Sequence, residues 1–399
     1  MRLVLVLGAA VSLLGLAACG AGTTGGAADG AVHRDGPSAD APGDSGQVTD
    51  GAPPDAAPPR PTKDYVFVAA DANIHRFAIN RDTGELASLG ATDTGVSGVG
   101  ALAHRPDGRV LYATLRGSSA VRAYAVDPNT GDLSELNTKT VPGGAVYLAV
   151  TSDGKWLLST YFSNDKAEAR ALAADGSLAE TAAATVNTAD EPHAVVLSPD
   201  GKYAFVPSRA TGRVYQYAFN GITGALTANA PAYVSAPSGA GSRHFAFHPS
   251  EPYAFGSNEY TDDVTTYAYD ADGGTLTKEG TVSALPNGLP SEFNAAADIH
   301  VHPSGKFVYS SNRGHDSIAV FSVGPTGALS RQENEPTEMK PRDFALDPDG
   351  RYLYAAGQDS GTVAAYSIHA FTGELTPIVT TAAPTHPEWV EVVRVELDP

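Results

Sequence analysis

A glycine recurs at nearly even intervals along most of this chain. It holds the same place in seven short segments, which read RDTGELASL, DPNTGDLSEL, AADGSLAET, GITGALTAN, DGGTLTKEG, GPTGALSRQ and AFTGELTPI. These glycines are Gly84, Gly131, Gly176, Gly224, Gly274, Gly327 and Gly373, with successive spacings of 47, 45, 48, 50, 53 and 46 residues. Periods of this length are typical of propeller blades. The recurring turn therefore predicts seven copies of one structural unit.

A second turn recurs inside these units, between short runs rich in Val, Tyr, Phe and Leu. Its copies are HRPDGRVLYAT, VTSDGKWLLST, LSPDGKYAFVP, FHPSEPYAFGS, VHPSGKFVYSS and LDPDGRYLYAA. Pro-Asp-Gly suits a tight turn because Pro presets φ and Gly accepts a positive φ. Each unit is therefore predicted to have four strands: one before this turn, one after it, one that ends at the Thr-Gly turn and one beyond.

The two ends of the repeat region complement each other. The first unit begins at KDYVFVAADANIHRFAIN and lacks a first strand, whereas the C-terminal segment PEWVEVVRVELDP (387–399) ends like FALDP (344–348). We expect the last strand to complete the first blade. The prediction is an all-β, seven-bladed β-propeller over residues 63–399. Two separate β-domains are the alternative, which the even spacing and the matched ends disfavour.

The N-terminus has the pattern of an export signal. Met1 and Arg2 precede LVLVLGAAVSLLGLAACG, an apolar run too short for a membrane-spanning helix. An ordinary cleaved signal peptide is one interpretation. We prefer another, because residues 16–19, Leu-Ala-Ala-Cys, resemble a bacterial lipobox and Cys19 is the only cysteine. We therefore predict removal of residues 1–18 as a lipoprotein signal peptide, and anchoring in a membrane through acyl chains on Cys19.

Residues 19–62 are predicted to form a disordered, lipid-anchored linker. They are mostly Gly, Ala, Pro, Asp, Ser and Thr, which bury too little surface to offset the entropy of ordering. The predicted location is thus outside the cytoplasm, on a membrane. In some bacteria an acidic residue directly after the lipidated cysteine retains a lipoprotein in the inner membrane. Residue 20 is a glycine here, which slightly favours the outer membrane.

Charge and composition exclude several functions. The formal net charge is −19 and no Lys/Arg-rich run occurs, so nucleic acid is not an expected partner. An anionic ligand would need a local cluster of arginines. No metal site or cofactor is predicted. His300 and His302 would lie on the same face of a strand, but the two-residue repeat of a strand explains this placement without a metal. The oligomeric state is left open.

Polar residues are predicted to converge at one end of the propeller axis. Two kinds of loop lie on the same face: those that enter the first strand of a blade and those that join its second and third strands. The first kind supplies His193, Arg243, His244, Asp298, His300, Arg342 and His386. The second kind supplies Tyr161, Arg209, Asn258, Glu259, Asn312, Arg313, Gln358 and Asp359.

Three longer segments carry a family resemblance. They read GAGSRHFAFHPSEPYAFGSNEYTDDVTTYAYD, ADIHVHPSGKFVYSSNRGHDSIAVFSV and PRDFALDPDGRYLYAAGQDSGTVAAYSI. The chain resembles the seven-bladed lactonase family, which contains propeller-type bacterial 6-phosphogluconolactonases and fungal carboxy-muconate lactonising enzymes. The resemblance implies catalytic positions at His193, Arg243, Glu259 and Arg313. His244 and Arg342 also match the family pattern; together with Asp298, placed by position alone, they are predicted to bind substrate.

These residue types suit the hydrolysis of a sugar-acid lactone. A base must activate water, and a positive group must stabilise the oxyanion. Glu259 or His193 is the expected base, and Arg243 and Arg313 would hold the oxyanion or an anionic group of the substrate. The family's phosphogluconolactonases are cytosolic, so an export signal argues for another lactone. The alternative function is a non-enzymatic surface propeller that binds a ligand or a protein partner.

Overall fold

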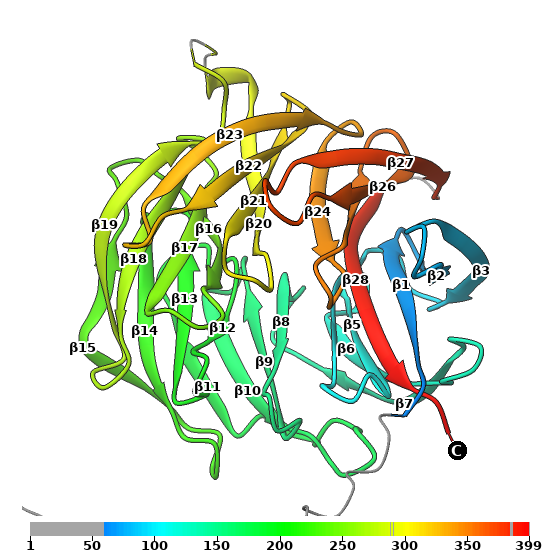
Figure 1. Cartoon of the computed structure of the whole chain (residues 1–399). Helices are drawn as coiled ribbons and strands as arrows, with labels where there is room; N and C mark the ends of the chain where they lie inside the picture. The colour runs from blue at the N-terminus through cyan, green and yellow to red at the C-terminus, as the bar shows by residue number, and fades with distance from the viewer. Residues whose placement is uncertain (1–59, 288, 290, 384–385, 399) are drawn as a thin grey trace, which may run out of the picture. The chain divides into compact units, whose positions relative to one another are not determined.

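Seven antiparallel sheets of four strands make up the part of the chain that the structure describes (Figure 1). The computed structural model describes residues 60–287, 289, 291–383 and 386–398. Within these ranges there is no α-helix, only two short 3-10 turns, η1 (Arg116–Ser118) and η2 (Ser291–Phe293). No helix in this part is long and apolar enough to cross a bilayer. The predicted signal peptide, Cys19 and most of the linker lie outside the described residues.

Six of the seven blades are built from consecutive strands, as the repeat predicts. Blade 2 contains β4 (Val99–His104), β5 (Val110–Leu115), β6 (Ala120–Val126) and β7 (Leu133–Thr140). Blade 3 contains β8 (Tyr147–Val150), β9 (Trp156–Tyr161), β10 (Lys166–Ala171) and β11 (Ala184–Asn187). Blade 4 contains β12 (Val196–Leu197), β13 (Tyr203–Ser208), β14 (Arg213–Phe219) and β15 (Leu226–Ser235).

The remaining consecutive blades follow the same order. Blade 5 contains β16 (Ser242–Phe247), β17 (Tyr253–Asn258), β18 (Asp263–Asp270) and β19 (Thr275–Ser283). Blade 6 contains β20 (Ala295–Val301), β21 (Phe307–Arg313), β22 (Ser317–Val323) and β23 (Leu329–Pro336). Blade 7 contains β24 (Pro341–Leu346), β25 (Tyr352–Gly357), β26 (Thr362–Ile368) and β27 (Leu375–Ala382). The seven-bladed propeller is thus confirmed.

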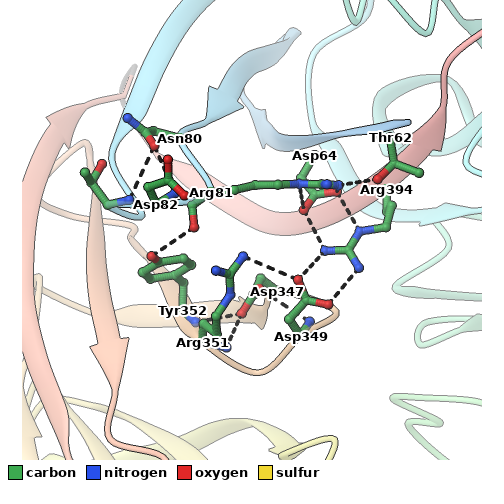
Figure 2. Close-up of polar contacts among 11 residues, drawn as sticks. Thr62, Asp64, Asn80, Arg81, Asp82, Asp347, Asp349, Arg351, Tyr352 and Arg394 are labelled. Carbon is green, nitrogen blue, oxygen red and sulfur yellow. Dashed lines mark hydrogen bonds and ion pairs between the residues drawn. The ribbon is translucent and has the colours of Figure 1, made fainter. Parts of the chain in front are cut away.

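Blade 1 combines both ends of the propeller. Its order is β28 (Pro387–Glu396), β1 (Thr62–Ala70), β2 (Asn73–Ile79) and β3 (Leu86–Asp93). The β28–β1 ladder runs from the pair Thr62–Glu396 to the pair Ala70–Pro387, which confirms the predicted closure. Charged side chains reinforce it: Arg394 of β28 binds Asp64 of β1 and Asp349 of blade 7, with N–O distances of 2.8 Å (Figure 2).

The recurring glycine of the Thr-Gly turn is explained by contacts between blades. At Gly224 (φ +75°), an added Cβ would lie 2.2 Å from Cζ3 of Trp156 in the preceding blade. All seven copies have positive φ and meet a side chain of the second strand of the preceding blade, which is the first residue of that strand in every blade except blade 1: Tyr352, Tyr65, Val110, Trp156, Tyr203, Tyr253 and Phe307, taken in order from Gly84. A side chain at this position would therefore be strained and would force the blades apart.

Candidate active site

Two pockets and a narrow throat lie along the propeller axis. An upper pocket of about 460 Å³ is lined by residues that include His193, Arg209, Glu259, Arg313 and Arg342. A lower pocket of about 450 Å³ is lined by residues that include Asp298, His300 and Glu391. The throat, about 10 Å³, shares His193 and Arg342 with the upper pocket and Asp343 and Trp389 with the lower one, so it lies between them. A separate cavity of about 520 Å³, beside Asp64 and Asp132, holds none of the predicted site residues.

Glu259 holds three arginines at the boundary between the upper pocket and the throat. Its Oε1 lies 2.8 Å from Nη1 of Arg209 and 3.3 Å from Nη2 of Arg313, and its Oε2 lies 3.2 Å from Nε of Arg243. Burial raises the pKa of Glu259, but the charges of Arg243, Arg313 and Arg209 outweigh burial and hold this pKa below its usual range. The carboxylate therefore stays ionised and is a weak proton acceptor.

A second carboxylate, Glu388 of β28, holds two further arginines. Its Oε2 lies 3.0 Å from Nη2 of Arg116 and 3.0 Å from Nε of Arg342. Burial raises the pKa of Glu388, but Arg342 and Arg116 lower it by more. With the pair between Arg209 and Glu191 at 3.0 Å, five guanidinium groups share three carboxylates. The site is locally positive in an acidic protein.

Arg243 carries the most deeply buried of these positive charges. It is only 2% exposed, and its Nη1 has no hydrogen-bond partner among the described residues. Burial lowers the pKa of Arg243 well below its usual value, and the charges of Arg313 and Arg342 lower it further. A guanidinium nevertheless remains protonated in proteins. An anionic ligand would relieve the unfavourable electrostatics here.

Two buried imidazoles meet in the throat. The ring centroids of His193 and His244 lie 5.3 Å apart. Burial lowers the pKa of His193 well below its usual value, and Arg243 and His244 add to the effect. Burial and Arg243 also lower the pKa of His244, to about 4. Both rings are therefore neutral near pH 7, and a neutral imidazole can accept a proton.

Asp298 lies beneath His244 rather than in the upper pocket. Its Oδ1 is 2.7 Å from Nδ1 of His244 and its Oδ2 is 2.9 Å from Nε2 of His300. Burial raises the pKa of Asp298, but the charge and hydrogen bonds of His300 and His244 lower it by more. Asp298 is therefore ionised, has both oxygens engaged by histidines and lines the lower pocket, so its predicted contact with a substrate stays a prediction.

A family model described as "Lactonase, 7-bladed beta-propeller" matches residues 62–392. The chain belongs to this lactonase family. It is 33% identical over 292 residues to a 6-phosphogluconolactonase of Pectobacterium carotovorum, which covers 73% of this chain and 87% of the relative. It is 31% identical over 337 residues to a 6-phosphogluconolactonase of Erwinia tasmaniensis, which covers 84% and 100%.

A solved structure has the same fold as this lactonase. The Pseudomonas aeruginosa periplasmic gluconolactonase PpgL superposes with a TM-score of 0.76 at 23% identity, over 84% of this chain and 99% of that one. At this identity the likeness concerns the fold. It extends over the seven blades, from which the side chains of the upper pocket and the throat project.

The lactonase brings most of the predicted residues together, with two additions. His193, Glu259, Arg313 and Arg342 line the upper pocket, and Arg243 and His244 line the throat. His386 lies elsewhere, exposed, with its Nδ1 3.9 Å from Asp71. Sequence reasoning missed Arg116 and Glu388. Arg116 directly follows the second strand of blade 2, and Arg209 directly follows the second strand of blade 4. A comparison of equivalent positions in the repeat would therefore have identified Arg116.

Among the residues described, no group of three His, Cys, Asp or Glu side chains has the arrangement of a metal site. The charged and titratable side chains that the lactonase presents to the upper pocket are those of Arg, His and Glu residues.

Proposed function

We propose that this lactonase hydrolyses the lactone of a sugar acid in the upper pocket. The observation that carries the proposal is the convergence of Arg209, Arg243 and Arg313 on Glu259, next to the throat in which two neutral imidazoles meet. Relatives about 30% identical over most of the chain are named 6-phosphogluconolactonase, which supports the same reaction. The convergence also favours an enzyme over the alternative of a non-enzymatic surface propeller, which requires no such meeting of groups.

The substrate of this reaction would carry an anionic group besides the lactone. Five guanidinium groups exceed the carboxylates that they contact, and Arg fits carboxylate or phosphate oxygens in a bidentate manner. A pocket of about 460 Å³ accommodates one sugar ring. A phosphate, as on the substrate named for the relatives, or a second carboxylate would meet this requirement.

The proposed mechanism is base-assisted attack of water on the lactone carbonyl. Arg243 or Arg313 would stabilise the oxyanion, because a fixed positive charge in a site of low dielectric favours the developing negative charge. Of the two bases expected from the sequence, Glu259 is tied to three arginines. The proton acceptor is therefore a throat imidazole, and Glu259 holds the guanidinium groups in place.

The enzyme would act outside the cytoplasm, anchored through Cys19. Support comes from the apolar run after Arg2 and from residues 16–19, which resemble a lipobox. Such a location would give the enzyme access to lactones present outside the cell or in the periplasm. An exported enzyme would then use a carboxylate-bearing sugar lactone more readily than a phosphorylated one.

A panel of lactones tests the function. Glucono-δ-lactone, 6-phosphogluconolactone and a sugar-diacid lactone would be followed by acid release at constant pH, with buffer alone as reference. The purified protein should accelerate at least one, with the anionic lactones favoured. Arg243→Ala and Glu259→Ala should abolish the gain, whereas Arg351→Ala, an exposed arginine outside the pocket, should not. A folded protein that accelerates none of the three would overturn the proposal.

A further inference from the structure

The ring of His244 is held in one orientation by a carboxylate from the next blade. His244 lies on β16 and Asp298 on β20, and both are nearly inaccessible, at 2% and 4% exposure. The 2.7 Å contact joins Nδ1 to Oδ1. Because Asp298 is ionised, the shared hydrogen belongs to Nδ1. In the neutral ring, Nε2 then carries the lone pair.

Asp298 is itself fixed on every side. Its Oδ2 accepts from Nε2 of His300 at 2.9 Å and from the backbone N–H of Phe344 at 3.3 Å. Its Oδ1 also accepts from the backbone N–H of Ile299 at 2.8 Å. His300 in turn packs against the ring of Phe344, with centroids 4.8 Å apart. The carboxylate therefore cannot rotate away from His244 without loss of several hydrogen bonds.

The free nitrogen of His244 is buried in the wall of the throat. Nε2 has no hydrogen-bond partner among the described residues, and neither has Nη1 of Arg243 or Nδ1 of His193. Buried polar atoms are normally paired with protein or water. The throat, at about 10 Å³, is close to the size needed for a single water. A sugar ring is too large for the throat, and of the two pockets that adjoin it the upper one carries the arginines that an anionic sugar lactone requires.

We propose that His244 is the acid–base residue of lactone hydrolysis, acting through Nε2 on a water in the throat, and that Asp298 is its positioning residue. This assignment rests on the proposed function. It gives Asp298 a role beneath His244 instead of a contact with the substrate.

The chemical step needs no reactant other than lactone and water. The water oxygen bonds to the lactone carbonyl carbon while its proton passes to Nε2 of His244, and the carbonyl electron pair moves onto oxygen beside Arg243. The intermediate then collapses, the bond from carbon to the ring oxygen breaks, and the ring oxygen takes the proton back from Nε2. The product is the open hydroxy acid. Asp298 remains ionised throughout and balances the transient imidazolium.

The other two candidate bases lack this support. Both oxygens of Glu259 contact arginines. His193 lies beside the edge of Phe162, with ring centroids 5.7 Å apart, and its Nδ1 has no partner among the described residues, so no carboxylate fixes its tautomer there. Of these three residues, His244 is the one that combines a fixed tautomer with a free nitrogen in the throat.

The tautomer can be measured in the unmodified protein. With ¹⁵N-labelled histidine, the NMR shifts of His244 near pH 7 should show a protonated Nδ1 and an unprotonated Nε2. This test does not depend on the folding of any variant. A His244 ring protonated at Nε2 would overturn the assignment.

Kinetics on the lactone that the enzyme hydrolyses provide the second test. His244→Gln should lower kcat by about 100-fold or more with little change in KM, since it removes a proton acceptor and not a binding group. Asp298→Asn should lower kcat by a smaller factor. Two variants serve as matched controls. Asp347→Asn changes a buried aspartate of blade 7, away from the throat, and His369→Gln changes an exposed histidine.

The pH profile separates positioning from a structural effect. Asp298 raises the pKa of His244, against burial and Arg243, which lower it to about 4. The acid limb of kcat/KM should therefore move to lower pH in Asp298→Asn. Several titratable and charged groups face His244 from the elements around it: Arg243, His193, Tyr147, Asp298 and His300, with Arg116, Arg342, Asp343 and Glu388 in the rest of the throat wall.

The outcomes distinguish this role from the function on which it rests. A wild-type protein inactive on every lactone overturns the proposed function and this role with it. An active wild type with an unimpaired His244→Gln variant overturns the role of His244 alone. An acid limb that stays in place in a folded Asp298→Asn variant overturns the positioning role of Asp298.

Discussion

Arg394 and Asp64 are 330 positions apart in the chain, yet two hydrogen bonds of 2.8 Å join their side chains (Figure 2). The same guanidinium binds Asp349 of blade 7 through two further bonds of 2.8 Å. One arginine of the last strand therefore connects the first strand of the propeller to its last blade. Arg81 of blade 1 also binds Asp64, with its Nε 2.8 Å from Oδ2. This network stabilises the ring at its point of closure.

Asp64→Asn should destabilise the propeller by about 2 kcal/mol, because it leaves Arg81 without its buried counter-charge and leaves Arg394 with Asp349 alone. Denaturant unfolding followed by circular dichroism would measure the loss. Asp82→Asn, a change at an exposed aspartate nearby, is the control and should change stability little. Equal stabilities of the two variants would show that the network contributes nothing to closure.

The same variant should reveal a pH dependence. Burial raises the pKa of Asp64, but Arg394 and Arg81 hold it below its ordinary value of 3.8 in the folded protein. A depressed folded pKa contributes stability above the unfolded pKa and loses it as the pH falls through the folded value. The difference in unfolding free energy between wild type and Asp64→Asn should therefore be largest near neutral pH and shrink below pH 3.8. A difference that grows on acidification would contradict this assignment.

Gly224→Ala should cost about 3 kcal/mol, since it adds strain at φ +75° to a clash with the Trp156 ring. Thermal unfolding of the variant would show a lowered Tm. Gly221→Ala, three positions away, meets nothing within 4 Å and serves as the control. If both variants unfolded alike, the recurring glycine would not owe its place to packing between blades.

Glu259→Gln should destabilise the protein by about 3 kcal/mol, because Arg209, Arg243 and Arg313 would repel one another without the carboxylate. Inorganic phosphate should raise the Tm of this variant more than that of wild type, since an anion can replace the lost charge. Glu279→Gln, a change at an exposed glutamate, is the matched control. The same phosphate response in all three proteins would argue against an anion site at these arginines.

The proposed lipid anchor predicts that Cys19→Ser abolishes membrane attachment and gives a soluble or signal-retaining form, because Cys19 is the only cysteine that could carry acyl chains. Metabolic labelling with a radioactive fatty acid, followed by membrane fractionation, would check both points. Label and membrane association that persist in Cys19→Ser would rule out this anchor. Unlabelled wild-type protein in the soluble fraction would point to simple secretion.

The sequence by itself determined the number of blades, the four strands of each and the closure by the last strand. These features are encoded locally: Gly224 and its six counterparts mark turns, and the apolar runs between turns have the length of strands. The repeat also placed His193, Arg243, Glu259 and Arg313 at one end of the axis. Equivalent positions in equivalent blades must lie at equivalent places around a ring.

Only the tertiary structure decided which of these residues contact one another. Glu388, on the closing strand, holds Arg116 and Arg342 from two other blades, and Asp298 lies below His244 instead of beside the upper pocket. The two residues of such a pair come from different blades and are separated in the sequence by one repeat or by several. Their distances depend on how far each strand extends along the axis and which way each side chain turns, and a repeat of turns and apolar runs encodes neither.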